Sequence, residues 1–163
     1  MNTVYHGSEF NFNIAKPNHN IRAHLDKNKK QVIDYKGVSL HVTPYKWIAL
    51  SYTYTKRQYF IHNGKKYVFN MGVNLKKKPN HKIIYIYGKR SLEYSLNKLY
   101  GNGGYLYLFD KKYFKRVKGI GINELISYTE QIPKKKIFLK NPVKEMEKIG
   151  VKFHFIDITK KQW

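Results

Sequence analysis

The alternation of apolar and polar residues predicts a chain built mostly from short strands. Residues 38–42 alternate in the manner of a half-buried strand. Two apolar runs, 59–61 and 67–69, flank a segment with Asn63-Gly64, the dipeptide typical of a tight hairpin turn. Further strands are expected at four runs rich in Val, Ile, Tyr and Phe, at 83–87, 104–109, 125–128 and 151–155.

Helix signals are confined to three short segments. Thr43 as N-cap, with a proline at the next position, predicts a helix over 44–54. Leucines at helical spacing predict a helix over 91–100, and a start and a stop signal bound a third over 142–149. Strands interleaved with a few helices indicate an α+β fold on curved, mainly antiparallel sheets.

The chain length and the absence of a linker favour one domain over residues 1–163. Its hydrophobic content of 42% is ordinary, and no apolar run approaches the ~18 residues of a membrane span. The first residues lack the pattern of a signal peptide, and there is no cysteine for disulfides or zinc sites. We therefore expect a cytoplasmic protein without membrane contact, in the host cell if the source is viral.

The charge is the unusual property of this composition. Thirty-two Lys and Arg face ten Asp and Glu, which gives a formal net charge of +22. Such a surface attracts polyanions, and nucleic acid is the first candidate partner. AT-rich codon usage would also raise the number of lysines, together with Asn, Ile and Tyr, but it does not explain the scarcity of acids.

Among the few acids, Glu124 stands out because it opens an apolar strand after a glycine-containing segment, where a carboxylate can face a cleft. An edge-strand charge that discourages aggregation is the simpler alternative. His6 is followed by Gly7, which lets a ligand approach the backbone, although taken alone the pair is more simply explained by a strand-ending turn. His19 and His24 fall in a stretch that reads as a loop. The histidines lack metal-site spacing, so no metal is expected, and no phosphate-binding glycine motif is present.

These features occur in the order of a known family. Residues 5–8, Tyr-His-Gly-Ser, resemble the first motif of the diphtheria-toxin-like ADP-ribosyltransferases, which include the poly(ADP-ribose) polymerases. Residues 37–43 and 49–52 resemble the second motif, a strand followed by a helix with Ala and Tyr. Residues 123–128, Asn-Glu-Leu-Ile-Ser-Tyr, resemble the third. The resemblance extends from about residue 4 to residue 139 and implies a split, mainly antiparallel sheet fold.

The resemblance also implies roles in binding and cleaving NAD. His6 would bond a ribose hydroxyl, Gly7 would hold the nicotinamide amide by its backbone, and Ser8 would assist at the ribose. Tyr52 would stack on the nicotinamide ring. Glu124 would bond the ribose 2′-hydroxyl and stabilise the oxocarbenium ion that forms as the glycosidic bond breaks.

Two positions depart from the family pattern. Ser39 stands where the first tyrosine of the cofactor site belongs, so Tyr52 remains for stacking, with Tyr54 as a possible substitute. Ile122 stands two residues before Glu124, where protein-modifying relatives often carry Glu or Gln.

The charge suggests the acceptor of the ADP-ribose. Basic residues near aromatic ones can hold a single strand by phosphate contacts and base stacking, and Lys56, Arg57, Lys115 and Arg116 are the candidates we single out. A further basic run occupies residues 76–78. We therefore expect ADP-ribose transfer to DNA or RNA, a chemistry suited to conflict between phage and host.

Three alternatives keep the fold and change the activity. A DNA glycosylase would use the same oxocarbenium chemistry without NAD. A non-enzymatic nucleic-acid-binding or inhibitor protein would retain a degenerate transferase fold. A tRNA 2′-phosphotransferase is disfavoured because its additional Arg and His motifs are not found, Arg22 being the lone arginine before Arg57.

Overall fold

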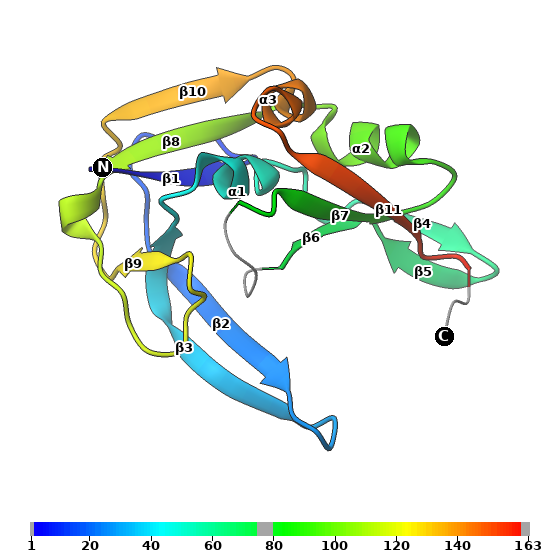
Figure 1. Ribbon diagram of the computed structural model, residues 1–163, viewed down its shortest axis with the longest axis horizontal. Coiled ribbons are helices and arrows are strands. Elements are labelled where there is room, and N and C mark those ends of the chain that lie inside the picture. The colour runs from blue at the N-terminus through cyan, green and yellow to red at the C-terminus, as the bar shows by residue number, and fades with distance from the viewer. Residues whose placement is uncertain (1, 75–79, 161–163) are drawn as a thin grey trace.

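The computed structural model describes residues 2–74 and 80–160, so the basic run at 76–78 lies outside the described part. The architecture is α+β, with antiparallel sheets and short helices (Figure 1). This confirms the predicted fold class. Within the described residues, no helix is both long and apolar enough to cross a membrane.

The first sheet is antiparallel throughout, with strand order β1-β8-β10. Its strands are β1 (Thr3–Ser8), β8 (Gly104–Asp110) and β10 (Lys135–Leu139). The second sheet has the order β11-β7-β6, from β6 (Asn70–Val73), β7 (Ile83–Gly88) and β11 (Lys152–Asp157). In this sheet β11 runs parallel to β7, and the chain between these two strands passes through two other sheets before a helix leads into β11.

The predicted hairpin is confirmed as β4 (Tyr59–His62) and β5 (Lys65–Val68). Its two turn residues, Asn63 and Gly64, have φ of 50° and 74°. Positive φ at both central positions is the requirement of a type I′ turn, which matches the twist of the flanking strands.

The third sheet contains the longest strand pair and projects from the rest of the molecule (Figure 1). It consists of β2 (Asn18–Leu25), β3 (Gln31–Val42) and β9 (Leu125–Ser127), in the order β2-β3-β9. We call the β2–β3 pair the arm. The loop predicted around His19 and His24 is therefore wrong. Polar and apolar residues do alternate along β2, but both of its faces are largely exposed, so the pattern lacks the buried face that usually marks a strand.

In the described part of the chain, three short helices pack against the sheets: α1 (Lys46–Ser51), α2 (Leu92–Tyr100) and α3 (Pro142–Lys148). Asn141 caps α3, in agreement with the predicted start signal, and Ser91, predicted as a helix residue, is the N-cap of α2. The helix predicted over 44–54 is shorter than expected. Thr43 does not cap it, because the helix begins at Lys46 with Tyr45 as the N-cap residue, and the hydroxyl of Thr43 accepts from the N–H of Tyr45 at 3.1 Å. A 3-10 turn elsewhere covers Lys111–Tyr113.

The join between the first and third sheets positions the site. The N–H of Tyr5 donates to the carbonyl of Thr43 at 2.7 Å, and the N–H of Thr43 returns a bond to Tyr5 at 2.9 Å. This pairing is a single bridge between β1 and the end of β3, not a continued ladder. Helix α1 follows at once and is buried along its length against the main core. A hollow therefore forms where the two sheets part.

Candidate active site

The hollow beside the Tyr5–Thr43 bridge is a cavity of about 430 Å³, which we call the His6 cavity. Its walls come from β1, the arm, α1 and the segment before β9. The predicted residues His6, Gly7, Ser8, Tyr52 and Glu124 all line it, although they come from three distant parts of the chain. The volume lies within the range of small-molecule sites.

His6 is held in one tautomer. Its Nδ1 lies 2.8 Å from the carbonyl oxygen of His41, and since a carbonyl only accepts, Nδ1 carries the proton. Burial lowers the pKa of His6 and outweighs the opposite effect of this hydrogen bond, so the ring is neutral at neutral pH. Nε2 is thus an acceptor suited to a hydroxyl group.

Gly7 is required twice. A Cβ at this position would overlap the carbonyl oxygen of Ala49, so only glycine lets α1 pack this closely on β1. Gly7 also lies two residues after Tyr5, so its N–H and C=O face the same edge of β1 that Tyr5 uses to pair with Thr43. At Gly7 that edge borders the cavity, which leaves a backbone donor and acceptor directed toward a ligand.

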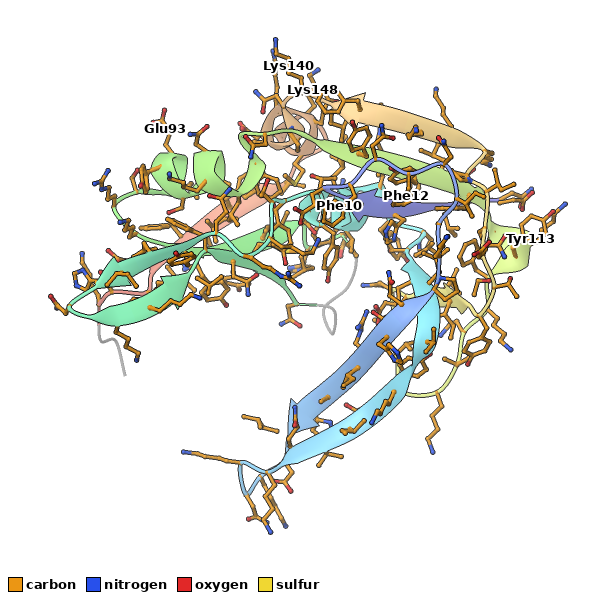
Figure 2. The ribbon with its side chains drawn as sticks, turned by 180° about the vertical axis from the view of Figure 1, so that it is seen from behind. Phe10, Phe12, Glu93, Tyr113, Lys140 and Lys148 are labelled. Carbon is orange, nitrogen blue, oxygen red and sulfur yellow. The ribbon has the colours of Figure 1, made fainter. Side chains whose placement is uncertain are left out.

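Ser8 ends β1 and turns the chain. Its Oγ accepts a hydrogen bond from the N–H of Phe10 at 3.0 Å. Phe10 and Phe12 lie beside β1 (Figure 2). Phe10 is 65% exposed and lines the His6 cavity, whereas Phe12 stacks on Tyr107 with ring centroids 3.9 Å apart. Phe10 is an aromatic surface at the cavity that the sequence interpretation missed.

Glu124 is buried and held from several sides. The N–H of Gly121 donates to its Oε2 at 2.6 Å. Arg116 supports the same segment, because its Nη1 donates to the carbonyls of Gly121, Ile122 and Glu124 at 2.8, 2.8 and 3.1 Å. The carboxylate is thereby fixed at the start of β9, facing the cavity.

Two residues that the sequence interpretation did not select surround this carboxylate. Arg22 donates from Nη2 to Oε1 of Glu124 at 2.5 Å and from Nε to both oxygens, at 3.1 and 3.2 Å. His41 places Nδ1 3.2 Å from the same Oε1. Burial opposes the charge of Glu124, but the hydrogen bonds from His41 and Arg22, the charge of Arg22 and the Gly121 amide together lower its pKa to about 2.

Ser39 does not line the cavity. The hydroxyl of Tyr35 donates to Ser39 Oγ at 2.8 Å, and Ser39 Oγ lies 3.0 Å from Nε2 of His41. Nδ1 on the other side of the His41 ring lies 3.2 Å from Oε1 of Glu124 and 3.1 Å from Nη2 of Arg22. Ser39 therefore orients His41 from behind, at the position where the resemblance implies a cofactor-stacking tyrosine.

Tyr52 lies just after α1 and is half-buried at the cavity wall. Burial and the nearby charge of Glu124 raise the pKa of Tyr52, so its hydroxyl stays protonated. Tyr54 takes another position. It packs edge-on against Tyr100 with centroids 6.4 Å apart and is not among the residues that line the His6 cavity.

The four basic residues predicted to bind nucleic acid fall in two places. Lys56 lines the His6 cavity, where its backbone N–H and its ammonium contact Glu9 at 3.0 and 3.8 Å. Burial lowers the pKa of Lys56. Arg57 beside it is exposed, with φ of 66°. The second place holds Lys115 and Arg116.

Lys115 and Arg116 differ in how strongly their side chains are engaged by the rest of the protein. The ammonium of Lys115 lies 4.9 Å from the ring centroid of Tyr128 at the surface. Arg116 is engaged with the backbone before Glu124, which makes it a support for the carboxylate as well as a surface cation. The binding of nucleic acid by these residues stays a prediction.

Within residues 2–74 and 80–160, no group of three or more His, Asp and Glu side chains is arranged to hold a metal ion. Comparison of the chain with protein-family models, with curated proteins and with solved structures finds no match.

Proposed function

We propose that this chain is a mono-ADP-ribosyltransferase that cleaves the nicotinamide–ribose bond of NAD and transfers ADP-ribose to nucleic acid. One observation carries the proposal. His6, Tyr52 and Glu124, selected from the family resemblance at three distant sites, line one cavity with an ionised carboxylate at its wall. The formal charge of +22 supports nucleic acid as the acceptor.

The chemistry follows from the contacts around the cavity. Gly7 offers its backbone N–H and C=O to the nicotinamide amide, and the neutral His6 accepts from a ribose hydroxyl through Nε2. Tyr52 provides an aromatic face for the nicotinamide ring. As the C–N bond breaks, nicotinamide leaves as a neutral molecule with the electron pair, and Glu124 stabilises the cation left on the ribose.

Arg22 sets a condition on this step. In the structure its guanidinium neutralises Glu124 and occupies both carboxylate oxygens. A cation next to the carboxylate opposes the positive charge that develops on the ribose. Arg22 therefore moves away from Glu124 when the substrate binds, and the 2′-hydroxyl of the ribose takes its place.

The direct test is to incubate the protein with NAD labelled in its adenylate part, together with single-stranded DNA, RNA or protein. Nicotinamide release and labelled nucleic acid are expected. Glu124→Gln should reduce both at least about a hundredfold, because it removes charge stabilisation of the transition state. NAD should still raise the melting temperature of Glu124→Gln, since ligand binding stabilises the folded state. Absence of nicotinamide release from the wild-type protein would reject the proposal.

A glycosylase that releases a base from DNA without NAD is a second candidate. The observation that favours it is the position of Ser39. The resemblance places a tyrosine at this motif position, but Ser39 contacts His41 instead, so of the two motif positions only Tyr52 lines the cavity. Incubation with DNA in the absence of NAD separates the two functions. Base release that depends on Glu124 would support the glycosylase, and label transfer that requires NAD would support the transferase.

A further inference from the structure

A second cavity shares a wall with the His6 cavity. It has a volume of about 590 Å³, and we call it the His24 cavity. Arg22 and Glu124 line both cavities, so their ion pair lies between the two. The rest of the His24 cavity comes from the arm, through Ala23, His24 and Asp34, and from the loop 119–122 before Glu124.

This cavity contains a histidine–carboxylate pair. Nδ1 of His24 lies 2.8 Å from Oδ2 of Asp34. The pair depends on a β-bulge: Arg22 is opposite Tyr35 and Ala23 is opposite Ile33, so Asp34 is the extra residue between them. A bulge redirects side chains, and here it brings Asp34 into contact with His24.

The loop on the other side of the cavity is packed tightly on this bulge. A Cβ at Gly119 would overlap the carbonyl oxygen of Asp34, and Gly119 has a φ of 92° that favours glycine. In Figure 1 the segment between β8 and β9 runs alongside β3. The His24–Asp34 pair and Glu124 therefore line one cavity, with the loop 119–122 packed against the bulge.

The pair has the arrangement of a general base. An aspartate carboxylate accepts, so Nδ1 of His24 carries the proton in this contact, and Nε2 of the neutral ring is left to take one. Carboxylates orient histidine bases in this way in hydrolases. The side chains of His24 and Asp34 are 45% and 35% exposed, so the pair is accessible to an incoming acceptor, and it lines the same cavity as Glu124.

The charge of the lining selects the acceptor chemistry. With His24 neutral, the His24 cavity has one cation, Arg22, and two anions, Asp34 and Glu124, in a protein of net charge +22. An anionic acceptor such as a terminal phosphate would meet a net negative lining, and it would need no base. A neutral N–H or O–H group must lose a proton when it attacks.

We propose that the His24 cavity is the acceptor site and that His24 is the general base that deprotonates a nucleobase nitrogen or a ribose hydroxyl, with Asp34 as positioning residue. The proposal rests on the proposed transferase function. The acceptor nitrogen or oxygen forms a bond to C1′ of the ribose after the bond to nicotinamide has broken. The acceptor's proton passes to Nε2 of His24, and nicotinamide departs neutral.

The test measures how the ADP-ribose is divided between the acceptor and water. His24→Ala should lower transfer to a single-stranded oligonucleotide without terminal phosphates by about a hundredfold, the contribution of a general base, while nicotinamide release by hydrolysis changes by less than about twofold. Added imidazole should restore part of the transfer. Asp34→Ala should lower transfer less than His24→Ala does, and Asp34→Asn, which keeps an acceptor for Nδ1–H, should recover part of the loss.

His19→Ala is the matched control, because His19 is an exposed histidine of the same strand that does not line the His24 cavity. It should leave transfer unchanged. Full transfer by His24→Ala, or label confined to terminal phosphates when these are present, would overturn the inference.

The two proposals fail in different ways. A wild-type protein that releases no nicotinamide rejects the transferase. In that case the site is judged by the imidazole resonances of His24 and His19 during titration with the oligonucleotide. A shift of His24 alone supports a nucleic acid site in the His24 cavity, and no shift of His24 overturns it.

Discussion

The first sheet and the arm are both antiparallel, yet they contribute to the site in different ways. In β8, Leu106 and Tyr107 are fully buried, so the sheet that carries β1 is part of the core. In the arm, Leu25 is 67% exposed, and the strand pair is solvated on both faces along most of its length. His6 and Gly7 therefore stand on a packed element, and Arg22 and His24 on an exposed one.

This difference separates two tasks. The first sheet carries groups expected to bind NAD. Their positions are fixed, because small displacements there would disturb the packed core. The arm supplies the groups expected to move or to meet the acceptor. It is linked to Glu124 mainly by hydrogen bonds and charge, through Arg22 and His41, and such contacts are exchanged more readily than buried apolar ones.

The largest contrast in stability should come from truncating one leucine in the buried core and one leucine on the arm. Leu99→Ala, at a fully buried position, should lower the free energy of unfolding by about 2–5 kcal/mol through lost burial and a cavity. Leu25→Ala on the arm should change it by less than about 0.5 kcal/mol. Urea unfolding of both variants measures the contrast. Equal losses would show that the arm is packed as tightly as the core.

Acid should weaken the join between the regions. The folded-state pKa of Glu124 is about 2, below its ordinary value of 4.5, so its contribution is full above pH 4.5 and is lost as the pH falls toward 2. The shift corresponds to roughly 3 kcal/mol. The difference in unfolding free energy between wild type and Glu124→Gln should shrink over this range at constant ionic strength. A difference independent of pH would contradict the ion pair.

Removing the arginine tests the same join from the arm. Arg22→Ala should raise the pKa of Glu124 and cost about 1–3 kcal/mol at neutral pH, because a buried carboxylate loses its charged donor. Arg22→Lys keeps the charge but not the planar donor geometry, and its effect should be smaller. NMR titration of the Glu124 carboxyl measures the shift. An unchanged pKa in Arg22→Ala would leave His41 and Gly121 as the dominant partners.

The smallest effect should come from the hydrogen bonds that join Tyr35, Ser39 and His41. Tyr35→Phe removes the hydroxyl that donates to Ser39 and should cost about 1 kcal/mol while altering the imidazole resonances of His41. Tyr113→Phe, at an exposed tyrosine, is the control and should change neither quantity. Unfolding curves and histidine spectra of the two variants give the comparison. Unaltered His41 resonances in Tyr35→Phe would show that the Tyr35–Ser39 hydrogen bond does not affect His41.

The sequence predicted most of the packed half. Alternation found β7 and β8, and Asn63-Gly64 located the β4–β5 hairpin, because a local backbone requirement selects these residues. It failed on β2, where His19 and His24 were taken as loop residues. In β2 the polar residues Asn20, Arg22 and His24 alternate with Ile21, Ala23 and Leu25, a signal that is weak without a buried face.

The candidate site divides in the same way. Motif order selected His6, Tyr52 and Glu124, which share a cavity. Arg22 and His41 were missed, although the lone arginine among the polar residues of an alternating stretch, and the polar His41 between apolar Leu40 and Val42, were visible signals. No spacing rule links residue 22 to residue 124, so their contact could not be read from the chain.

By itself, the sequence determined the local structure: the turns, the helix caps, the strand periodicity and the strong positive charge, all of which depend on neighbouring residues or on composition. The tertiary structure decided what the site contains. In it Ser39 contacts His41 and does not line the His6 cavity, Lys56 lines that cavity, and the Arg22–Glu124 ion pair lies between the two cavities. These outcomes depend on where β1, the arm and β9 meet, and that is fixed by packing across the whole chain.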